Sequence, residues 1–292
     1  MQYNFKSTEL LINFSKFIHP MKSSVTFFVA LCFIVLYSCG NQPPINELPK
    51  VKSDREESGM KGDVKILKQE EFFPGSSFDQ IGHRTSENNF SIEFNKNGEK
   101  LGEAIYDSLG EISSMCSYKF SDKGLKLEKK EVDLDGDIIK KCTYEYDSFG
   151  RTVKFNISEP KKGLEYYSIS EYDNMGNEIK STIYDPSGQK IETGEYAYQN
   201  GNNVKLVLKD FLDTPIAISE YGYNMNGDII KEIYYTGNNL KFEEYSYEYT
   251  YDYNNNWIKM VKKLDAKYMN TSSNENRRIG VQTITLRTLV YN

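Results

Sequence analysis

Three carboxylates at alternate positions, Asp133, Asp135 and Asp137, have the spacing best suited to binding a metal ion. Calcium takes several oxygen ligands, and a loop that carries Asp at alternate positions beside a Gly can supply them. The later Glu that completes an EF-hand loop is absent, and Asp and Gly are also the residues that tight turns prefer. We therefore expect no bound metal, with a calcium site at these three aspartates as the alternative.

Groups for nucleophilic or acid–base catalysis are sparse after residue 38. His83 is the one histidine there, and no recognisable nucleophile motif stands beside it. One histidine together with Cys116 and Cys142 cannot supply the clustered ligands of a zinc site. Among 42 Asp and Glu residues, no spacing selects a carboxylate pair for glycoside hydrolysis. We expect no catalytic residues and no cofactor, with a carboxylate-dependent hydrolase as the alternative.

Tyrosine is abundant, with 23 copies, and many of these stand in pairs two residues apart. Side chains two apart along a strand point to the same face, so these tyrosines would line one face of a sheet. We favour a structural role, since cross-strand aromatic pairs stabilise a sheet by about 0.2–1 kcal/mol each. The alternative is a binding face, because Tyr offers large contact area at low entropic cost. The candidates are Tyr118, Tyr144, Tyr146, Tyr172, Tyr196, Tyr198, Tyr221, Tyr223, Tyr251 and Tyr253.

The elements that position these tyrosines follow from a repeat of 26 residues. Around Tyr146 a strand ends, Asp147 and Gly150 form a turn, and the next strand begins, because Asp bonds its own backbone and Gly accepts positive φ. Turn signals recur every 11–14 residues over about residues 90–265, and no helical stripe of convincing length appears. The sequence predicts an all-β fold, an antiparallel β-hairpin meander forming an elongated or curled sheet. A β-solenoid is the alternative.

Two cysteines distinguish these two folds. Cys116 and Cys142 are 26 residues apart and occupy the same position of the repeat. In a meander another strand lies between theirs, which separates them by about 9.6 Å, whereas a disulfide needs Cα atoms about 4.4–6.8 Å apart. A solenoid with one repeat per rung would stack them on adjacent strands. The meander therefore predicts two free thiols.

The turns resemble the YD repeats of the RHS family. Tyr146-Asp147-Ser-Phe-Gly150-Arg151 is similar to the Tyr-Asp-x-x-Gly-Arg/Asn core of these repeats, and partial copies extend over about residues 90–265. The resemblance implies β-hairpin strips that coil into a continuous sheet, and it implies no activity. Large family members form a shell around a toxin, but this chain is too short to enclose a domain.

The N-terminal segment is typical of a secretory signal, with a basic residue, a short apolar run from Val25 to Tyr37 and a small residue before Cys39. Its end, Leu36-Tyr37-Ser38-Cys39, resembles the lipobox of bacterial lipoproteins, in which the Cys is acylated and becomes the first mature residue. We expect residues 1–38 to be a signal peptide, with 1–20 an upstream extension if Met21 is the start. Residues 39–62 would then be the lipidated Cys and a flexible tether, and 63–292 a single β-repeat domain. Within this domain we expect a polar loop from Ser76 to Asn89 and a last loop from Asn270 to Asn276.

Together these features predict a lipoprotein of the bacterial cell envelope, held at the outer membrane by its lipid anchor. We expect a non-catalytic binding or scaffold module for an envelope protein or glycan. An immunity-type lipoprotein that intercepts a toxin is the alternative that the family's toxin associations suggest. The chain carries 36 Lys and Arg against 42 Asp and Glu, and this mild acidity gives no reason to expect nucleic acid.

Overall fold

The computed structural model describes residues 52–76, 80–160, 162–268 and 279–292. The expected signal peptide, Cys39, most of the expected tether and the expected loop of residues 270–276 lie outside these ranges. The described residues form one short helix, α2 (Asp54–Glu57), and seventeen strands. The strands are β1 (Val64–Pro74), β2 (Ile81–Arg84), β3 (Phe90–Phe94), β4 (Lys100–Tyr106), β5 (Ile112–Phe120), β6 (Lys126–Val132), β7 (Ile138–Tyr146), β8 (Thr152–Glu159), β9 (Gly163–Tyr172), β10 (Glu178–Tyr184), β11 (Lys190–Gln199), β12 (Asn202–Asp210), β13 (Pro215–Tyr223), β14 (Ile229–Thr236), β15 (Lys241–Tyr251), β16 (Trp257–Lys267) and β17 (Gly280–Tyr291).

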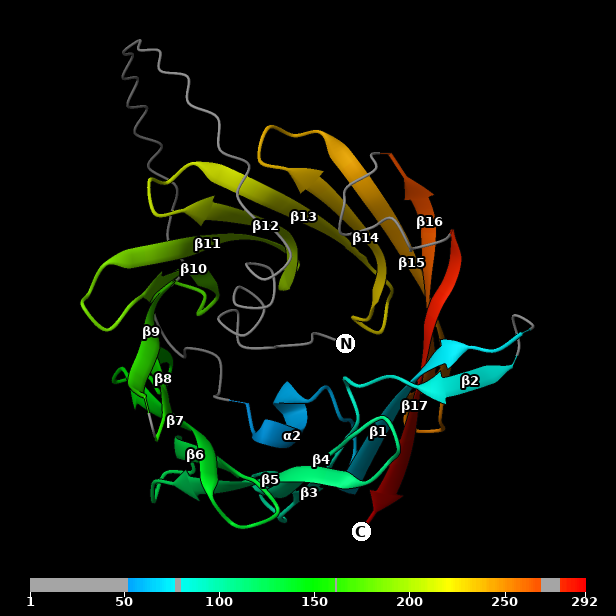
Figure 1. Ribbon diagram of the computed structural model, residues 1–292, viewed down its shortest axis with the longest axis horizontal. Helices are drawn as coiled ribbons and strands as arrows, with labels where there is room; N and C mark the ends of the chain where they lie inside the picture. Colours follow the sequence, from blue (N-terminus) through cyan, green and yellow to red (C-terminus); the bar gives the residue numbers. More distant parts are fainter. Residues whose placement is uncertain (1–51, 77–79, 161, 269–278) are drawn as a thin grey trace.

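The strands form an antiparallel meander that closes on itself (Figure 1). From β3 to β17 each strand pairs with the next along the chain. β17 then pairs with β1, from Val64 opposite Tyr291 to Phe72 opposite Ile284, and β1 pairs with β3. Because β2 pairs only with β1, sixteen strands make the wall of a closed β-barrel. The all-β antiparallel meander is confirmed, but it closes into a barrel, so the expected elongated or curled sheet and the solenoid alternative are wrong. The pairing that closes the barrel joins opposite ends of the chain, which the local repeat does not specify.

The turns of the wall follow from Asp and Gly. Asp147 Oδ1 accepts hydrogen bonds from the backbone N–H groups of Phe149 and Arg151, each at 2.9 Å. The N–H of Gly150 donates to the carbonyl of Asp147 at 3.1 Å, and Gly150 has φ 79°. A register shift follows in the next strand, so each turn adds a β-bulge. The same side-chain capping of the backbone two and four residues ahead recurs at Asp107, Asp133, Asp173, Asp185, Asp210, Asn224 and Asp252.

The register defines which side chains face the interior. α2 lies inside the ring of strands (Figure 1), and Arg55 of α2 sits over the ring of Phe94, 5.9 Å from its centroid. Residues paired across an antiparallel ladder share a face. The lumenal face therefore runs through the paired residues Ile92, Glu103, Cys116, Glu131 and Lys140. The outward face runs through Ser117, Lys130, Lys141 and Ser158.

Two segments differ from the expected organisation. The end of the segment expected to be a tether is folded, because Ser53 caps α2 in a capping box with Glu56. The polar loop expected from Ser76 to Asn89 contains strand β2. Its residue His83 packs against Phe73 with the two rings tilted, and the ring centroids are 4.8 Å apart. Among the described residues, no helix is long and apolar enough to cross a membrane.

Candidate functional site

The lumenal wall gathers charged side chains over β4 to β7, in a group that we call the basic zone. Three of its lysines surround the ring of Tyr118, with Nζ atoms of Lys100, Lys126 and Lys129 at 5.7, 5.3 and 5.9 Å from the centroid. Glu103 lies 3.8 Å from Lys100 and 3.5 Å from Lys129, and it accepts a hydrogen bond from the hydroxyl of Tyr118. The zone consists of Lys100, Glu103, Tyr118, Lys126, Lys129, Glu131 and Lys140.

The buried charges of the basic zone depend on one another. Burial raises the pKa of Glu103, but Lys100, Lys129 and the Tyr118 hydroxyl together lower that pKa to about 2. Burial lowers the pKa of Lys100, and the attraction of Glu103 opposes this shift. Burial and Glu103 both raise the pKa of Tyr118. The zone is therefore a set of partly desolvated cations that an anion stabilises.

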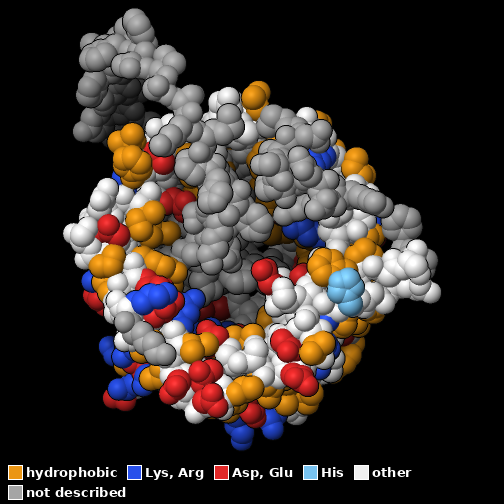
Figure 2. All heavy atoms as spheres, viewed as in Figure 1, with side chains coloured by type: hydrophobic (Ala, Val, Ile, Leu, Met, Phe, Trp, Pro, Cys, Tyr) orange, Lys and Arg blue, Asp and Glu red, His pale blue; other side chains and the backbone are white. Residues whose placement is uncertain are grey.

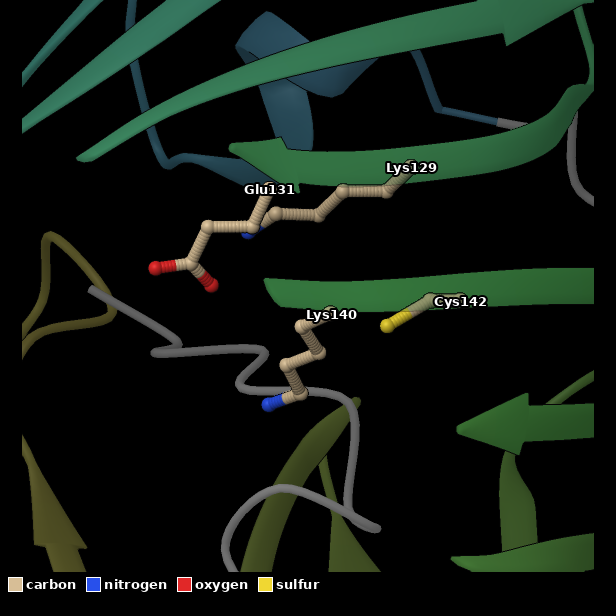
Figure 3. Close-up of a pocket in the computed structure, with 4 residues that line it drawn as sticks. All are labelled: Lys129, Glu131, Lys140 and Cys142. Carbon is tan, nitrogen blue, oxygen red and sulfur yellow. The ribbon is translucent and has the colours of Figure 1, made fainter. Parts of the chain in front are cut away.

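Next to this set is a small cavity on the same face of β6 and β7 (Figure 3). It has a volume of about 20 Å³ and is lined by Lys129, Glu131, Lys140 and Cys142. Such a volume holds roughly one water molecule. The hydroxyl of Ser114 donates to Glu131 at 2.7 Å. Lys140 forms no ion pair within 4.0 Å among the described residues, so its ammonium adds positive charge to this end of the zone.

Across the lumen, β13 to β16 carry a second polar group, which we call the tyrosine–acid zone. The hydroxyl of Tyr247 donates to Glu232 at 2.5 Å, and that of Tyr245 donates to Glu243 at 2.7 Å. Lys262 lies over the ring of Tyr245, 4.4 Å from the centroid, and 3.9 Å from Glu232. Glu232 pairs with Tyr245 and Glu243 pairs with Tyr234, so the two carboxylates are diagonal neighbours on one face.

Between these zones, β9 to β12 present an apolar wall that contains one unpaired acid. Glu192 pairs across the ladder with Ile183, which belongs to a buried cluster with Leu206 and Leu208. Its side chain is 4% exposed, and its Oε1 atom has no hydrogen-bond partner. Burial raises the pKa of Glu192 to about 8. This carboxyl is therefore protonated at neutral pH in the folded protein.

The structure uses several of the candidate tyrosines to hold the wall together. The hydroxyls of Tyr146, Tyr172 and Tyr223 donate to the backbone carbonyls of Lys126, Thr152 and Asn203, at 2.7, 2.7 and 2.6 Å. Each bond links the end of one strand to the start of the preceding strand. Other candidates, Tyr144, Tyr196, Tyr198 and Tyr221, pack in the hydrophobic clusters of the lumenal face.

Of the remaining candidates, Tyr118 belongs to the basic zone, whereas Tyr251, Tyr253 and the three aspartates lie in or near turns. The hydroxyl of Tyr251 donates to Asp228 at 2.7 Å, and Tyr253 is 82% exposed at a hairpin tip. Asp133 accepts from the backbone N–H groups of Asp135 and Asp137, as its counterparts do in the sibling turns. Within the described ranges, no group of three or more His, Cys, Asp and Glu could hold a metal ion.

Cys116 and Cys142 lie on β5 and β7 with β6 between them, and both are buried and outside any disulfide. This arrangement is the one that the meander predicts. Burial raises the pKa of the Cys116 thiol to about 12, so the thiol stays protonated. The lysines and glutamates of the lumen were not among the sequence candidates. Alternation marks two faces of each strand, but both faces of this wall carry charges, and the sequence does not say which face is inside.

No family model matches the chain, and no curated protein matches it. Among solved structures, the chain is similar to a porin-like protein from Bacteroides uniformis, with a TM-score of 0.53 and 10% identity over 79% of this chain and 99% of that one. A porin-like protein from Bacteroides vulgatus matches with a TM-score of 0.31 and 11% identity over 78% and 98% of the two chains. The structure of TcdB2-TccC3-TEV matches with a TM-score of 0.28 and 11% identity, over 68% of this chain and 14% of that one. The first of these similarities shows the fold, a closed antiparallel β-barrel of porin-like form.

Proposed function

We propose that this chain is a non-catalytic binding or scaffold module of the bacterial envelope, lipidated at Cys39, whose barrel stands in water beside the membrane. The observation that carries the proposal is the charge on the outward face of the wall. A barrel that spans a bilayer presents an apolar band about 25 Å tall to the lipid. The outward face here presents ladders of Lys and Glu instead.

Ion pairs cross between neighbouring strands around the outside of the barrel, and Figure 2 shows side chains of both charges along the edge where β6 and β7 lie. On β6 and β7, Glu128 lies 3.0 Å from Lys130 and 2.7 Å from Lys141. On β14 and β15, Lys231 lies 2.7 Å from Glu244, and Lys231 and Lys241 together lower the pKa of Glu244 to about 2. Similar outward pairs are Lys154–Glu145, Lys180–Glu171, Lys205–Glu220, Lys209–Glu195 and Lys263–Glu248.

These charges would make contact of the outward face with lipid unfavourable. A Lys or Arg on the lipid face of a barrel costs about 2–4 kcal/mol near the bilayer midplane. The outward lysines stand within strands on several sides of the wall, so each of them would add this free-energy penalty if the wall were in lipid. Twelve residues lie between Cys39 and Lys52, where the described fold begins, and such a chain spans at most about 45 Å. A lipid at Cys39 would therefore hold the barrel close to a membrane without inserting it.

The lumen is the face best equipped for binding, because it combines lysines, carboxylates and tyrosines on a closed wall. A second candidate, a carboxylate-dependent hydrolase, is favoured by the diagonal placement of Glu232 and Glu243. Diagonal neighbours on a sheet face lie about 7–8 Å apart, within the range of the acid and base of inverting glycosidases. We favour the non-catalytic module because each of these acids already accepts a hydrogen bond from a wall tyrosine.

Mass spectrometry of the N-terminal peptide tests the anchor. The proposal expects an acylated Cys39 at the mature N-terminus, and an intact peptide crossing Ser38 and Cys39 would contradict it. Incubation with a panel of envelope glycans tests the chemistry. The module should release no sugar, whereas cleavage that is lost in Glu232→Gln would establish the hydrolase instead.

A further inference from the structure

We propose that the basic zone is a binding site for a soluble carboxylate or phosphate, and that α2 occupies this site with Asp54 until such an anion displaces it. The inference rests on the proposed function in one respect, that the lumen is the binding surface. It adds the chemical class of the ligand and the segment that competes with it.

Asp54 enters the basic zone from a segment that precedes the barrel wall. One carboxylate oxygen accepts a hydrogen bond from the Lys126 ammonium, and the other accepts from the backbone N–H of Lys100 at 3.0 Å. Asp54 is 8% exposed, and the Lys126 side chain is 11% exposed. A cation and a backbone donor that converge on one buried carboxylate are also the groups that bind a carboxylate or phosphate ligand.

Without α2 the wall itself is positive at this place. The basic zone contains four lysines, at positions 100, 126, 129 and 140, against two glutamates, at 103 and 131. The whole chain has a formal charge of −6, so the basic zone is locally positive in a protein that is negative overall. Asp54 supplies one of the missing negative charges, and a free anion would supply it equally well.

The rest of the segment that carries α2, residues 52–63, docks through hydrogen bonds to two turns of the wall. The N–H of Arg55 donates to the Gly98 carbonyl at 2.9 Å, and its guanidinium donates to the Asn95 carbonyl at 2.6 Å. The side chain of Asn256 exchanges two hydrogen bonds with the backbone of Lys61, at 2.7 and 2.8 Å. Release of the segment would not break any strand pairing of the wall.

Gly98 shows how close this docking is. Gly98 has φ 83°, and a Cβ at this position would lie 2.7 Å from Ser53 Oγ. The absent side chain therefore leaves room for the N-cap of α2 against the turn between β3 and β4. At this turn the contact is made by polar groups, which water can replace, whereas Met60 anchors the other end of the segment in an apolar cluster.

The single tryptophan of the chain reports whether the segment is docked. Trp257 is 2% exposed and belongs to the same buried cluster as Met60, which follows α2. It also adjoins Asn256, the residue that holds Lys61. Departure of the segment would uncover this cluster and shift the tryptophan emission to longer wavelength.

The test is a titration of the full chain with inorganic phosphate, followed by Trp257 fluorescence at an ionic strength kept constant with chloride. Wild type should show a saturable red shift. Asp54→Asn keeps an oxygen for the Lys100 N–H but removes the competing charge. The midpoint of its phosphate titration should be up to roughly 10-fold lower than that of wild type. This change corresponds to the loss of one charge-assisted hydrogen bond that phosphate has to displace.

Two variants serve as controls. Asp63→Asn removes a carboxylate of the same segment that pairs with Arg55 at 2.6 Å and lies outside the basic zone, so it should titrate like wild type. Lys126→Gln in the Asp54→Asn background should abolish the response. Equal phosphate affinity in wild type and Asp54→Asn, or unchanged binding after Lys126→Gln, would overturn the proposal.

The wild-type titration keeps the test decisive if Asp54→Asn does not fold, because absence of any phosphate response in wild type would also overturn the proposal. A parallel titration with phosphatidylglycerol vesicles distinguishes a soluble anion from a lipid headgroup. A shift with vesicles and none with phosphate would contradict the assignment to a soluble ligand. None of these results depends on acylation of Cys39 or on the outward face, so the proposed function is tested separately.

Discussion

Glu192 should make the stability of the barrel fall as the pH rises from about 5 to 8. Its carboxyl is 4% exposed in an apolar part of the lumenal wall, and burial raises its pKa from the ordinary 4.5 to about 8. Between these two values the folded protein holds a proton that the unfolded chain has lost. The free energy of unfolding therefore decreases with pH by up to about 1.4 kcal/mol per unit, or roughly 3–5 kcal/mol across the window.

Glu192→Gln removes this dependence, because the amide is neutral at every pH. Near pH 4.5 both side chains are largely uncharged, and the variant should be about as stable as wild type. By pH 8.5 the variant should be more stable by most of that 3–5 kcal/mol. Urea unfolding at pH 4.5, 6, 7 and 8.5, followed by Trp257 fluorescence and circular dichroism, measures the difference at each pH.

Glu195→Gln is the matched control on the same strand. Glu195 faces outward, is 43% exposed and pairs with Lys209 at 2.6 Å. An exposed ion pair of this kind contributes about 0–1 kcal/mol to stability. The control should therefore follow the pH profile of wild type. Parallel profiles for wild type and Glu192→Gln would refute the assignment of a buried neutral carboxyl.

Three further outcomes follow from the wall. Gly150→Val should lower stability by roughly 1–3 kcal/mol in thermal or urea unfolding, because φ is 79° there, and Gly102→Val, in a strand without positive φ, should cost less. Tyr172→Phe should cost about 1 kcal/mol by urea unfolding through loss of its hydroxyl bond to a strand carbonyl, and no change would remove the structural role of that hydroxyl. Cys116 and Cys142 should both react with a maleimide after denaturation without reductant, whereas an intramolecular disulfide would contradict the meander.

The turns and strands could be predicted from the sequence because they are local. A single repeat already contains the two residues that make the turn. One is an Asp that accepts hydrogen bonds from the backbone two and four residues ahead, and the other is a Gly with positive φ. The helix α2 had a local signal too, the capping box of Ser53 and Glu56, although a segment of four residues shows no periodicity.

Closure and the lumenal chemistry could not be predicted in this way. The barrel closes through contacts such as Arg287 Nε donating to Gln69 Oε1 at 3.0 Å, between residues 218 apart, and the 26-residue repeat does not encode this pairing. The sequence also does not show which face of each strand lines the lumen. Lys129 points into the lumen and Lys130 points outward, and the sequence does not distinguish the two orientations because both residues are lysines.

The central claim, that the outward face of the barrel meets water, is tested most directly by labelling it in the membrane. Ser117→Cys on β5 and Ala197→Cys on β11 place thiols at exposed outward positions, against a background in which Cys116 and Cys142 are buried at 4% and 3% exposure. In washed native membranes opened to both sides, a charged maleimide should label both variants as fast as in detergent. Protection of both positions until detergent is added would place the wall in lipid and contradict the account.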